Sequence, residues 1–200
     1  NDFPKWETVY SFYSRMCLDG TMEKISDALT KINRENNDKN PIPTHIIIDS
    51  QSVKMANHGE QKGIDGGKRI KGRKRHMATD TMGNVVFVKA HAANIHDTVA
   101  GVDIVDAVVK KNPQAKTFSV DKGYRGTTKN FAEKVLGKTV LIASKEENTW
   151  AVVTWRWVVE RTFAWLGNYR RLSKDYEYAT LYSECFVYLA NIFLIVKRLF

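Results

Sequence analysis

Little in this chain points to disulfides, a membrane or a secretory signal. Cys17 and Cys185 are the only cysteines and lie far apart, which excludes a paired metal-ligand spacing and favours reduced thiols in a cytoplasmic protein. The longest apolar run, Cys185 to Val196, has twelve residues, whereas a membrane span needs about twenty. We therefore expect no membrane partner. The start lacks a signal-peptide pattern, and because the first residue is Asn1 we expect either a fragment or a numbering that omits a leading segment.

The composition is that of a packed, basic protein. The 200 residues are 43% hydrophobic and 11% aromatic, which suits one domain with a modest appendage. A net charge of +9 and an isoelectric point of about 9.5 favour a polyanionic partner. Charge alone does not choose between nucleic acid and an acidic membrane surface.

The pattern changes along the chain from helical to alternating. Residues 4–35 have helical spacing with a break at Asp19-Gly20, and residues 36–43 are a polar linker with two prolines. Further on, we predict strands at 46–49, 75–80, 85–90, 117–120 and 139–143, and helices at 97–111, 127–136, 150–168 and 179–198. This divides the chain into a helical N-terminal segment, residues 1–40, and an α/β domain, residues 41–200.

The order of these elements predicts a ribonuclease-H-like mixed five-stranded sheet flanked by helices. In that fold the first three strands are antiparallel, and the fourth and fifth add in parallel through helical crossovers. The ends of the first and fourth strands are then neighbours. This would bring Asp49 and Asp121 together.

Three acidic residues each follow an apolar run: Asp49, Asp121 and Glu160. An isolated carboxylate in such a place is costly to desolvate, and two close together repel each other. Two Mg²⁺ ions, held about 3.5–4 Å apart by oxygen ligands, would remove that penalty and supply phosphoryl-transfer chemistry. Taken singly, however, an Asp after a strand is usually a turn or helix cap, and a Glu in a helix is usually solvated.

The residues around these carboxylates carry a family resemblance. The segments Ile48–Lys54, Gly66–His76, Asp121–Gly126 and Arg156–Leu166 resemble, in collinear order, bacterial insertion-sequence transposases of the DDE superfamily, with the insertion sequence five family as the nearest group. The resemblance implies that Asp49, Asp121 and Glu160 form a catalytic triad holding two Mg²⁺ or Mn²⁺ ions.

A signature around the catalytic Glu matches only in part. Relatives carry Tyr, Arg and Lys at minus seven, minus four and plus seven, and this chain has Val153, Arg156 and Gly167 there. Arg156 precedes Glu160 by one helical turn and is placed to meet a phosphate. The Tyr and Lys roles do not transfer, although Lys174 or Arg170 are candidates to replace the Lys.

Basic residues gather in two groups. Residues 62–75 hold seven Lys or Arg among four glycines, which is typical either of a solvated loop or, beside Asp49, of a DNA contact. A second group follows the catalytic Glu. The predicted DNA-binding residues are Lys68, Arg69, Lys71, Arg73, Lys74, Arg75, Arg156, Arg161, Arg170 and Arg171. Such contacts position DNA without reading its sequence.

Other polar and aromatic residues favour structural roles. Trp155, Trp157, Phe163 and Trp165 have core spacing, with base stacking as the alternative, and Trp157 is the least settled. Asp80 at a hairpin turn and Asp97 at a helix start are rival acidic candidates for which we expect structural roles. His91 and His96 favour packing or capping over a metal site, and His76 is at best a DNA contact.

These features predict a DNA transposase that cuts transposon ends and joins them to target DNA. The resemblance implies double-stranded DNA partners (terminal inverted repeats and target), a homodimer or larger synaptic complex, and a cytoplasmic bacterial location on the nucleoid. Two alternatives stay open: a domesticated DNA-binding protein without activity, and a ribonuclease-H-like nuclease without strand transfer. Residues 1–40 are a candidate remainder of an end-recognition region.

Overall fold

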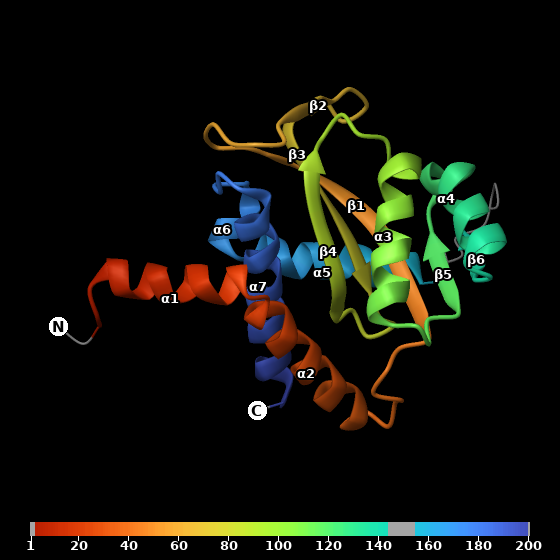
Figure 1. Cartoon of the computed structure of the whole chain (residues 1–200), viewed down its shortest axis with the longest axis horizontal. Helices are drawn as coiled ribbons and strands as arrows, with labels where there is room; N and C mark the ends of the chain where they lie inside the picture. Colours follow the sequence, from red (N-terminus) through yellow and green to blue (C-terminus); the bar gives the residue numbers. More distant parts are fainter. Residues whose placement is uncertain (1–2, 144–154, 200) are drawn as a thin grey trace.

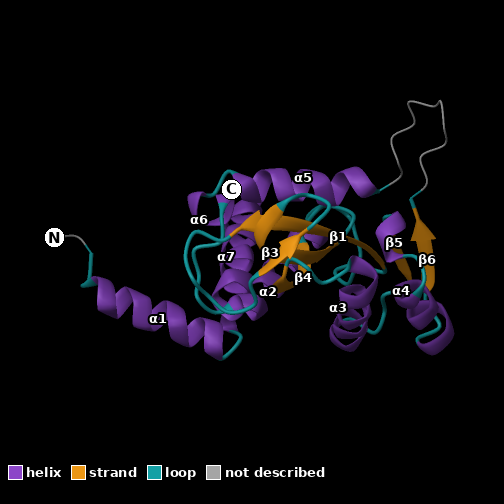
Figure 2. Ribbon diagram, turned by 90° about the horizontal axis from the view of Figure 1, so that it is seen from above, coloured by secondary structure: helices purple, strands orange, loops and turns teal. Residues whose placement is uncertain are grey.

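The computed structural model describes residues 3–143 and 155–199 (Figure 1). Two helices, α1 (Trp6–Leu18) and α2 (Thr21–Glu35), come first and are separated by Gly20, which has a φ of 72°. This confirms the predicted break, because glycine adopts a positive φ without steric cost. Only Cys17 of α1 is buried, and α1 projects from the body of the protein (Figures 1 and 2).

The α/β part follows the linker. Its strands and helices are β1 (His45–Lys54), β2 (Gly63–Asp65), β3 (Ile70–Thr79), β4 (Val85–Ala92), α3 (Asp97–Lys111), β5 (Thr117–Val120), the short turn η1 (Lys122–Tyr124), α4 (Thr127–Asn130), η2 (Phe131–Val135), β6 (Thr139–Ile142), α5 (Arg156–Gly167), α6 (Arg170–Ser173) and α7 (Thr180–Leu199). The part of the predicted 150–168 helix before residue 155 lies outside the described residues.

One mixed sheet organises the molecule. Strand β1 pairs antiparallel with β3 and parallel with β5, β3 pairs antiparallel with β4, and β5 pairs parallel with β6. This is the ribonuclease-H-like strand order, as predicted. The sheet has six strands, not five, because the short β2 pairs with the start of β3. Strand β1 also runs five residues beyond Asp49, because Ser50 to Lys54 continue the pairing with β3.

Alternating side chains on the central strand contribute to two hydrophobic cores. Ile47 faces α5 and α7, in a core with Met77 and Val88. Its neighbours Ile46 and Ile48 face the opposite way, in a core with residues of α3 and β5. Figure 2 accordingly shows α5 on one side of the sheet and α3 and α4 on the other. This alternation explains the unbroken apolar run, since a strand covered on both faces needs no polar positions.

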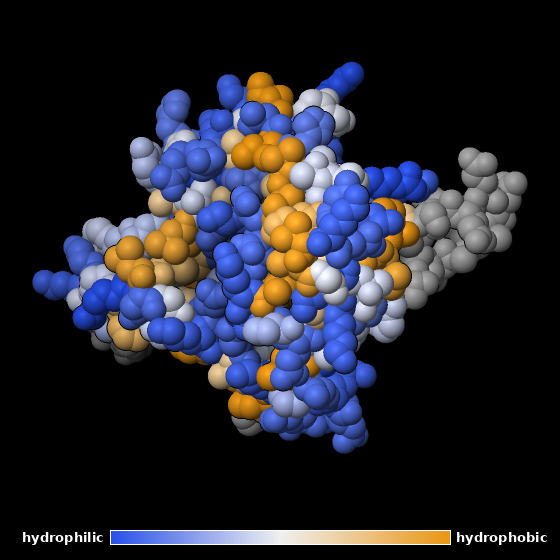
Figure 3. All heavy atoms as spheres, turned by 45° about the vertical axis from the view of Figure 1, so that its right-hand side comes forward, coloured by the Kyte–Doolittle hydropathy of each residue, from blue (hydrophilic) through white to orange (hydrophobic). Residues whose placement is uncertain are grey.

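Helix α7 belongs to the first of these cores. By length and composition it is apolar enough to cross a membrane, a longer stretch than the twelve-residue run counted in the sequence. A core helix passes the same test, and α7 buries Val187, Tyr188 and Ile195 while packing on α2 and β4. On the face drawn in Figure 3, hydrophobic residues form a central band within a mainly hydrophilic surface.

Candidate active site

Two of the three predicted carboxylates lie side by side at one edge of the sheet. The parallel register of β1 and β5 pairs Ile46 with Phe118 and Ile47 with Ser119. Two residues further along both strands, the same register brings Asp49 level with Asp121. The Ser50 backbone N–H donates to Asp49 Oδ1 at 2.8 Å, and the Gly123 N–H donates to Asp121 Oδ1 at 2.7 Å. Local backbone therefore fixes both side chains.

The electrostatics of Asp49 favour a bound cation. Burial, together with the nearby charge of Asp121, raises the pKa of Asp49 to about 6, while Arg156 and Lys68 oppose the shift. A carboxylate in this setting is less stable in its charged form than one in water. A divalent ion would relieve both the desolvation and the repulsion. The oxygen donors suit Mg²⁺ or Mn²⁺, so the residues present fit the metal that the resemblance implies.

Glu160 is placed differently from the two aspartates. It lies on α5, half its side chain is exposed, and its Oε1 forms an ion pair with Arg156 Nε at 3.0 Å. Arg156 is also close enough to Asp49 to lower its pKa, so it links the two carboxylates. Over residues 3–143 and 155–199, no three His, Cys, Asp or Glu side chains lie close enough to hold one ion. In this arrangement the triad is therefore not a closed cluster.

A third aspartate reaches the same edge of the sheet. Asp97, expected to be only a helix start, is the first residue of α3, and its Oδ1 accepts hydrogen bonds from Ser50 Oγ at 3.0 Å and Lys74 Nζ at 2.9 Å. The sequence pattern alone did not predict that Asp97 lies beside Asp49 and Asp121. A signal was available, because β4 runs parallel to β1 when both pair antiparallel with β3, so the end of β4 returns the chain to this edge.

Two further buried residues line this region. Tyr124 is fully buried with its hydroxyl near the Ser50 side chain, and its pKa is raised well above the usual value by burial and then by Asp49, Asp97 and Asp121. His76 is also fully buried, and its Nδ1 lies 2.6 Å from Nε2 of His91. The expected DNA contact by His76 is therefore wrong, whereas the packing role expected for His91 is confirmed.

The basic run of residues 62–75 divides into an exposed and a buried part. Lys68, Arg69 and Lys71 are exposed around the turn between β2 and β3. Arg73, Lys74 and Arg75 lie within β3 and are buried. The predicted DNA contact does not hold for these three, because their charged groups bind within the chain.

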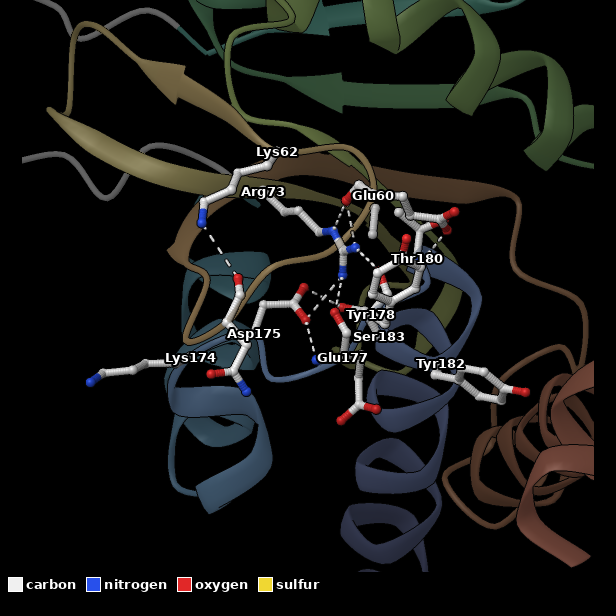
Figure 4. Close-up of polar contacts among 12 residues, drawn as sticks. Glu60, Lys62, Arg73, Lys174, Asp175, Glu177, Tyr178, Thr180, Tyr182 and Ser183 are labelled. Carbon is white, nitrogen blue, oxygen red and sulfur yellow. Dashed lines mark hydrogen bonds and ion pairs between the residues drawn. The ribbon is translucent and has the colours of Figure 1, made fainter. Parts of the chain in front are cut away.

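Arg73 is the centre of an internal network (Figure 4). It forms an ion pair with Asp175 at 3.2 Å and donates to the carbonyls of Glu60, Glu177 and Tyr178. Arg75 donates to the carbonyls of Leu172 and Lys174. Both arginines therefore fasten the segment between α6 and α7 to the sheet.

The remaining predicted residues lie mainly on α5 and α6. Arg161 is half-buried, stacks between Trp157 and Trp165 with its guanidinium 4.5 and 4.3 Å from the ring centroids, and donates to the Met82 carbonyl. Arg170 and Arg171 are exposed, and Arg171 also pairs with Glu177. Lys174 is exposed, and position 153 lies outside the described residues.

Most of the other aromatic and acidic candidates have structural positions. Phe163 is a core residue and Trp155 packs against the core, whereas Trp157 is 45% exposed. Asp80 has the structural role that we predicted, because it is fully buried, pairs with Arg34 at 2.7 Å and accepts from the Met82 and Asn84 backbone at the hairpin turn. His96 occupies the N-cap position of α3, although its side chain makes no capping hydrogen bond.

Comparison with known proteins places these features in a family. A putative transposase for insertion sequence element IS402 from Burkholderia cepacia is 30% identical over 114 residues, 53% of this chain and 54% of that protein. The chain thus spans about half the length of this curated relative. Among solved structures, the catalytic domain of Mos1 mariner transposase is similar with a TM-score of 0.47 and 11% identity, covering 88% of this chain and 89% of that one. The Mos1 strand transfer complex has a TM-score of 0.34 and 10% identity, covering 88% and 58%.

The family model that matches carries the description "Transposase DDE domain" and spans residues 40–181, from the linker before β1 into α7. This segment contains Asp49, Asp121 and Glu160. It covers more than half of the chain, which therefore belongs to the transposase DDE domain family.

Proposed function

We propose that this chain is the catalytic part of an insertion-sequence transposase that cuts DNA at the ends of its element and joins them to target DNA. The observation that carries the proposal is the placement of Asp49, on β1, near Asp121, directly after the neighbouring parallel strand β5, within the segment that matches the family. The quoted motifs favour the insertion sequence five family within this group.

Asp49 and Asp121 would hold the divalent ions, and Glu160 would complete the set once released from Arg156. Two such ions supply charge stabilisation for the attacking and leaving oxygens of an in-line displacement. In the first reaction, a water oxygen bonds to phosphorus and the 3′ oxygen leaves as a hydroxyl. In the second, the oxygen of that hydroxyl bonds to phosphorus of a target phosphodiester and the 3′ oxygen of the target strand leaves as a hydroxyl. No covalent bond to the protein is required in either reaction.

The chain's own cations would position the DNA. Lys68 and Arg69 are exposed on the β2–β3 turn and Lys71 is exposed at the start of β3, and Lys68 is near enough to Asp49 to lower its pKa. Arg156 pairs with Glu160, is near enough to Asp49 to lower its pKa, and is partly exposed. A phosphate bound by Arg156 would compete for its guanidinium and free the Glu160 carboxylate. DNA binding and completion of the triad would thus be coupled.

The wider assignments follow from the same proposal. The partners would be the terminal inverted repeats and target DNA, bound by a dimer or larger synaptic complex on the bacterial nucleoid in the cytoplasm. The family match begins at residue 40, so residues 1–39 lie before it. We assign residues 1–40 to an N-terminal segment distinct from the catalytic domain of residues 41–200. Within the described structure, α2 of this segment packs against α7.

The test is Mn²⁺-dependent nicking and joining of supercoiled plasmid DNA. Asp49→Ala and Asp121→Ala should each abolish nicking, because each removes a metal-binding carboxylate. Asp103→Ala is the matched control, since Asp103 is an exposed aspartate on α3. Joined products would identify a transposase, whereas nicking alone would identify a nuclease. DNA binding without either product would favour a binding protein, and nicking that persists in both site variants would contradict the proposed centre.

A further inference from the structure

The Asp97 carboxylate has one oxygen committed to the fold and one facing the candidate centre. Its Oδ1 accepts from Ser50 Oγ and Lys74 Nζ. Its Oδ2 lies 3.5 Å from the point where a Cβ on Gly123 would stand, and Asp121 Oδ1 lies 3.0 Å from that same point. Oxygens of two carboxylates therefore converge above Gly123. The Asp97 side chain is 25% exposed.

The histidine pair shows that a group able to donate hydrogen bonds belongs beside Asp97. Because the Ala92 carbonyl can only accept, the proton of neutral His91 is on Nδ1, which lies 2.9 Å from that oxygen. His91 Nε2 is then an acceptor, so His76 donates to it from Nδ1. In this pair of buried neutral rings, His76 Nε2 therefore carries a lone pair and no proton.

That lone pair has no partner in the chain. His76 Nε2 is buried, makes no hydrogen bond, and lies 3.6 Å from Asp97 Oδ1, which is itself an acceptor. The Tyr124 hydroxyl is also buried, close to the Ser50 side chain, and the Tyr124 ring makes a T-shaped contact with the His76 ring. Buried polar atoms in folded proteins are almost always satisfied, by water or a ligand where the chain supplies nothing. A hydrated cation supplies such donors, since its waters can bond to these atoms.

We propose that Asp97 is a further metal-binding carboxylate of the centre, which shares a hydrated ion with Asp121, and that His76 and Tyr124 bond to water of this ion. The inference rests on the proposed function and deepens it. Lys74 and Ser50 hold Asp97 by Oδ1 and leave Oδ2 for the ion. Asp97 thereby supplies a carboxylate next to Asp121 while Glu160 is still engaged by Arg156.

The test measures Mn²⁺ binding to the DNA-free chain, by the loss of the free Mn²⁺ electron paramagnetic resonance signal. Asp97→Asn should raise the Kd at least about tenfold, as expected when a metal site loses a supporting carboxylate. Asp103→Asn, on the same helix and exposed, should leave the Kd unchanged. Ser50→Ala keeps the Asp97 carboxylate and its ion pair with Lys74 and removes one hydrogen bond, so we expect a smaller rise in the Kd than for Asp97→Asn. An equal loss in Ser50→Ala and Asp97→Asn would make Asp97 only a positioning residue and overturn its assignment as a ligand.

The variant Asp121→Asn distinguishes a failure of the Asp97 assignment from a failure of the proposed function. If Asp121→Asn weakens Mn²⁺ binding and Asp97→Asn does not, Asp97 is no ligand and the proposed function stands. If neither variant changes binding, both fail. Because Asp97→Asn leaves the buried Lys74 without its ion pair, thermal unfolding is measured alongside. Should that variant unfold, Lys74→Met with Asp97→Asn is compared with Lys74→Met alone, and the same tenfold difference is expected between them.

Discussion

The basic run of residues 62–75 has an exposed half and a buried half. Lys68, Arg69 and Lys71 stand in solvent around the β2–β3 turn, whereas Arg73 and Arg75, a few residues later, are buried in β3. In the amino-acid sequence, the two halves look alike, because both are clusters of Lys and Arg. What separates them is the point where β3 enters the sheet between β1 and β4, at Gly72 and Arg73, beyond which Arg73 and Arg75 meet the segment before α7. The positive charges of the first half are therefore free to bind a partner at the surface, whereas those of the second half stabilise the tertiary structure.

The largest difference between the halves should appear in stability. Arg73→Met leaves the fully buried Asp175 without its cation and the Glu60 and Tyr178 carbonyls without a donor. We expect the free energy of unfolding to fall by about 3–5 kcal/mol, as when one partner of a buried ion pair is removed. Urea denaturation measures this. Lys71→Met, an exposed residue of the same strand, is the control and should change stability by less than about 0.5 kcal/mol.

The exposed half should govern DNA affinity. Replacing Lys68, Arg69 and Lys71 together by Ala removes three cations from the surface near Asp49. We expect the Kd for duplex DNA to rise roughly tenfold to a hundredfold and the salt slope of log K to shrink by about 3, since each phosphate contact contributes about 0.9. A fluorescence anisotropy titration over several salt concentrations measures both, and an unchanged slope would remove this turn from the DNA interface.

The sequence pattern predicted the features that depend on residues close together in the chain or on the order of the strands. The apolar run Ile46 to Ile48 identified the central strand, and the strand order brought Asp49 level with Asp121. The burial of Arg73 could not be predicted in this way, because its partner Asp175 lies 102 residues away. The position of Asp97 depended equally on the path of the chain, through the direction of β4. Glu160 was correctly predicted to lie on a helix. Its ion pair with Arg156, which competes with a metal ion for the carboxylate, was not implied by the resemblance.

Arg170 and Arg171 repeat the contrast between neighbours on a smaller scale. Arg171 pairs with Glu177 and stacks on Phe186 with its guanidinium 5.0 Å from the ring centroid. Arg170 forms no ion pair within residues 3–143 and 155–199. Arg170→Ala should therefore weaken DNA binding a few-fold and reduce the salt slope by about 1 without changing stability. Arg171→Ala should instead lower stability by about 0.5–1 kcal/mol. Paired titrations and melts of both variants test this, and the reverse assignment would contradict it.

The smallest effect should come from Arg156, the cation that stands between surface and fold. Its ion pair with Glu160 joins successive turns of α5, and both side chains are more than one-third exposed. Such pairs contribute about 0.3–0.5 kcal/mol, so Arg156→Gln should barely change the urea midpoint. A loss of more than about 1 kcal/mol would show that Arg156 belongs with Arg73 among the cations that hold the fold. A small loss would leave its guanidinium available to exchange Glu160 for a phosphate at little cost, as the coupling of DNA binding to the triad requires.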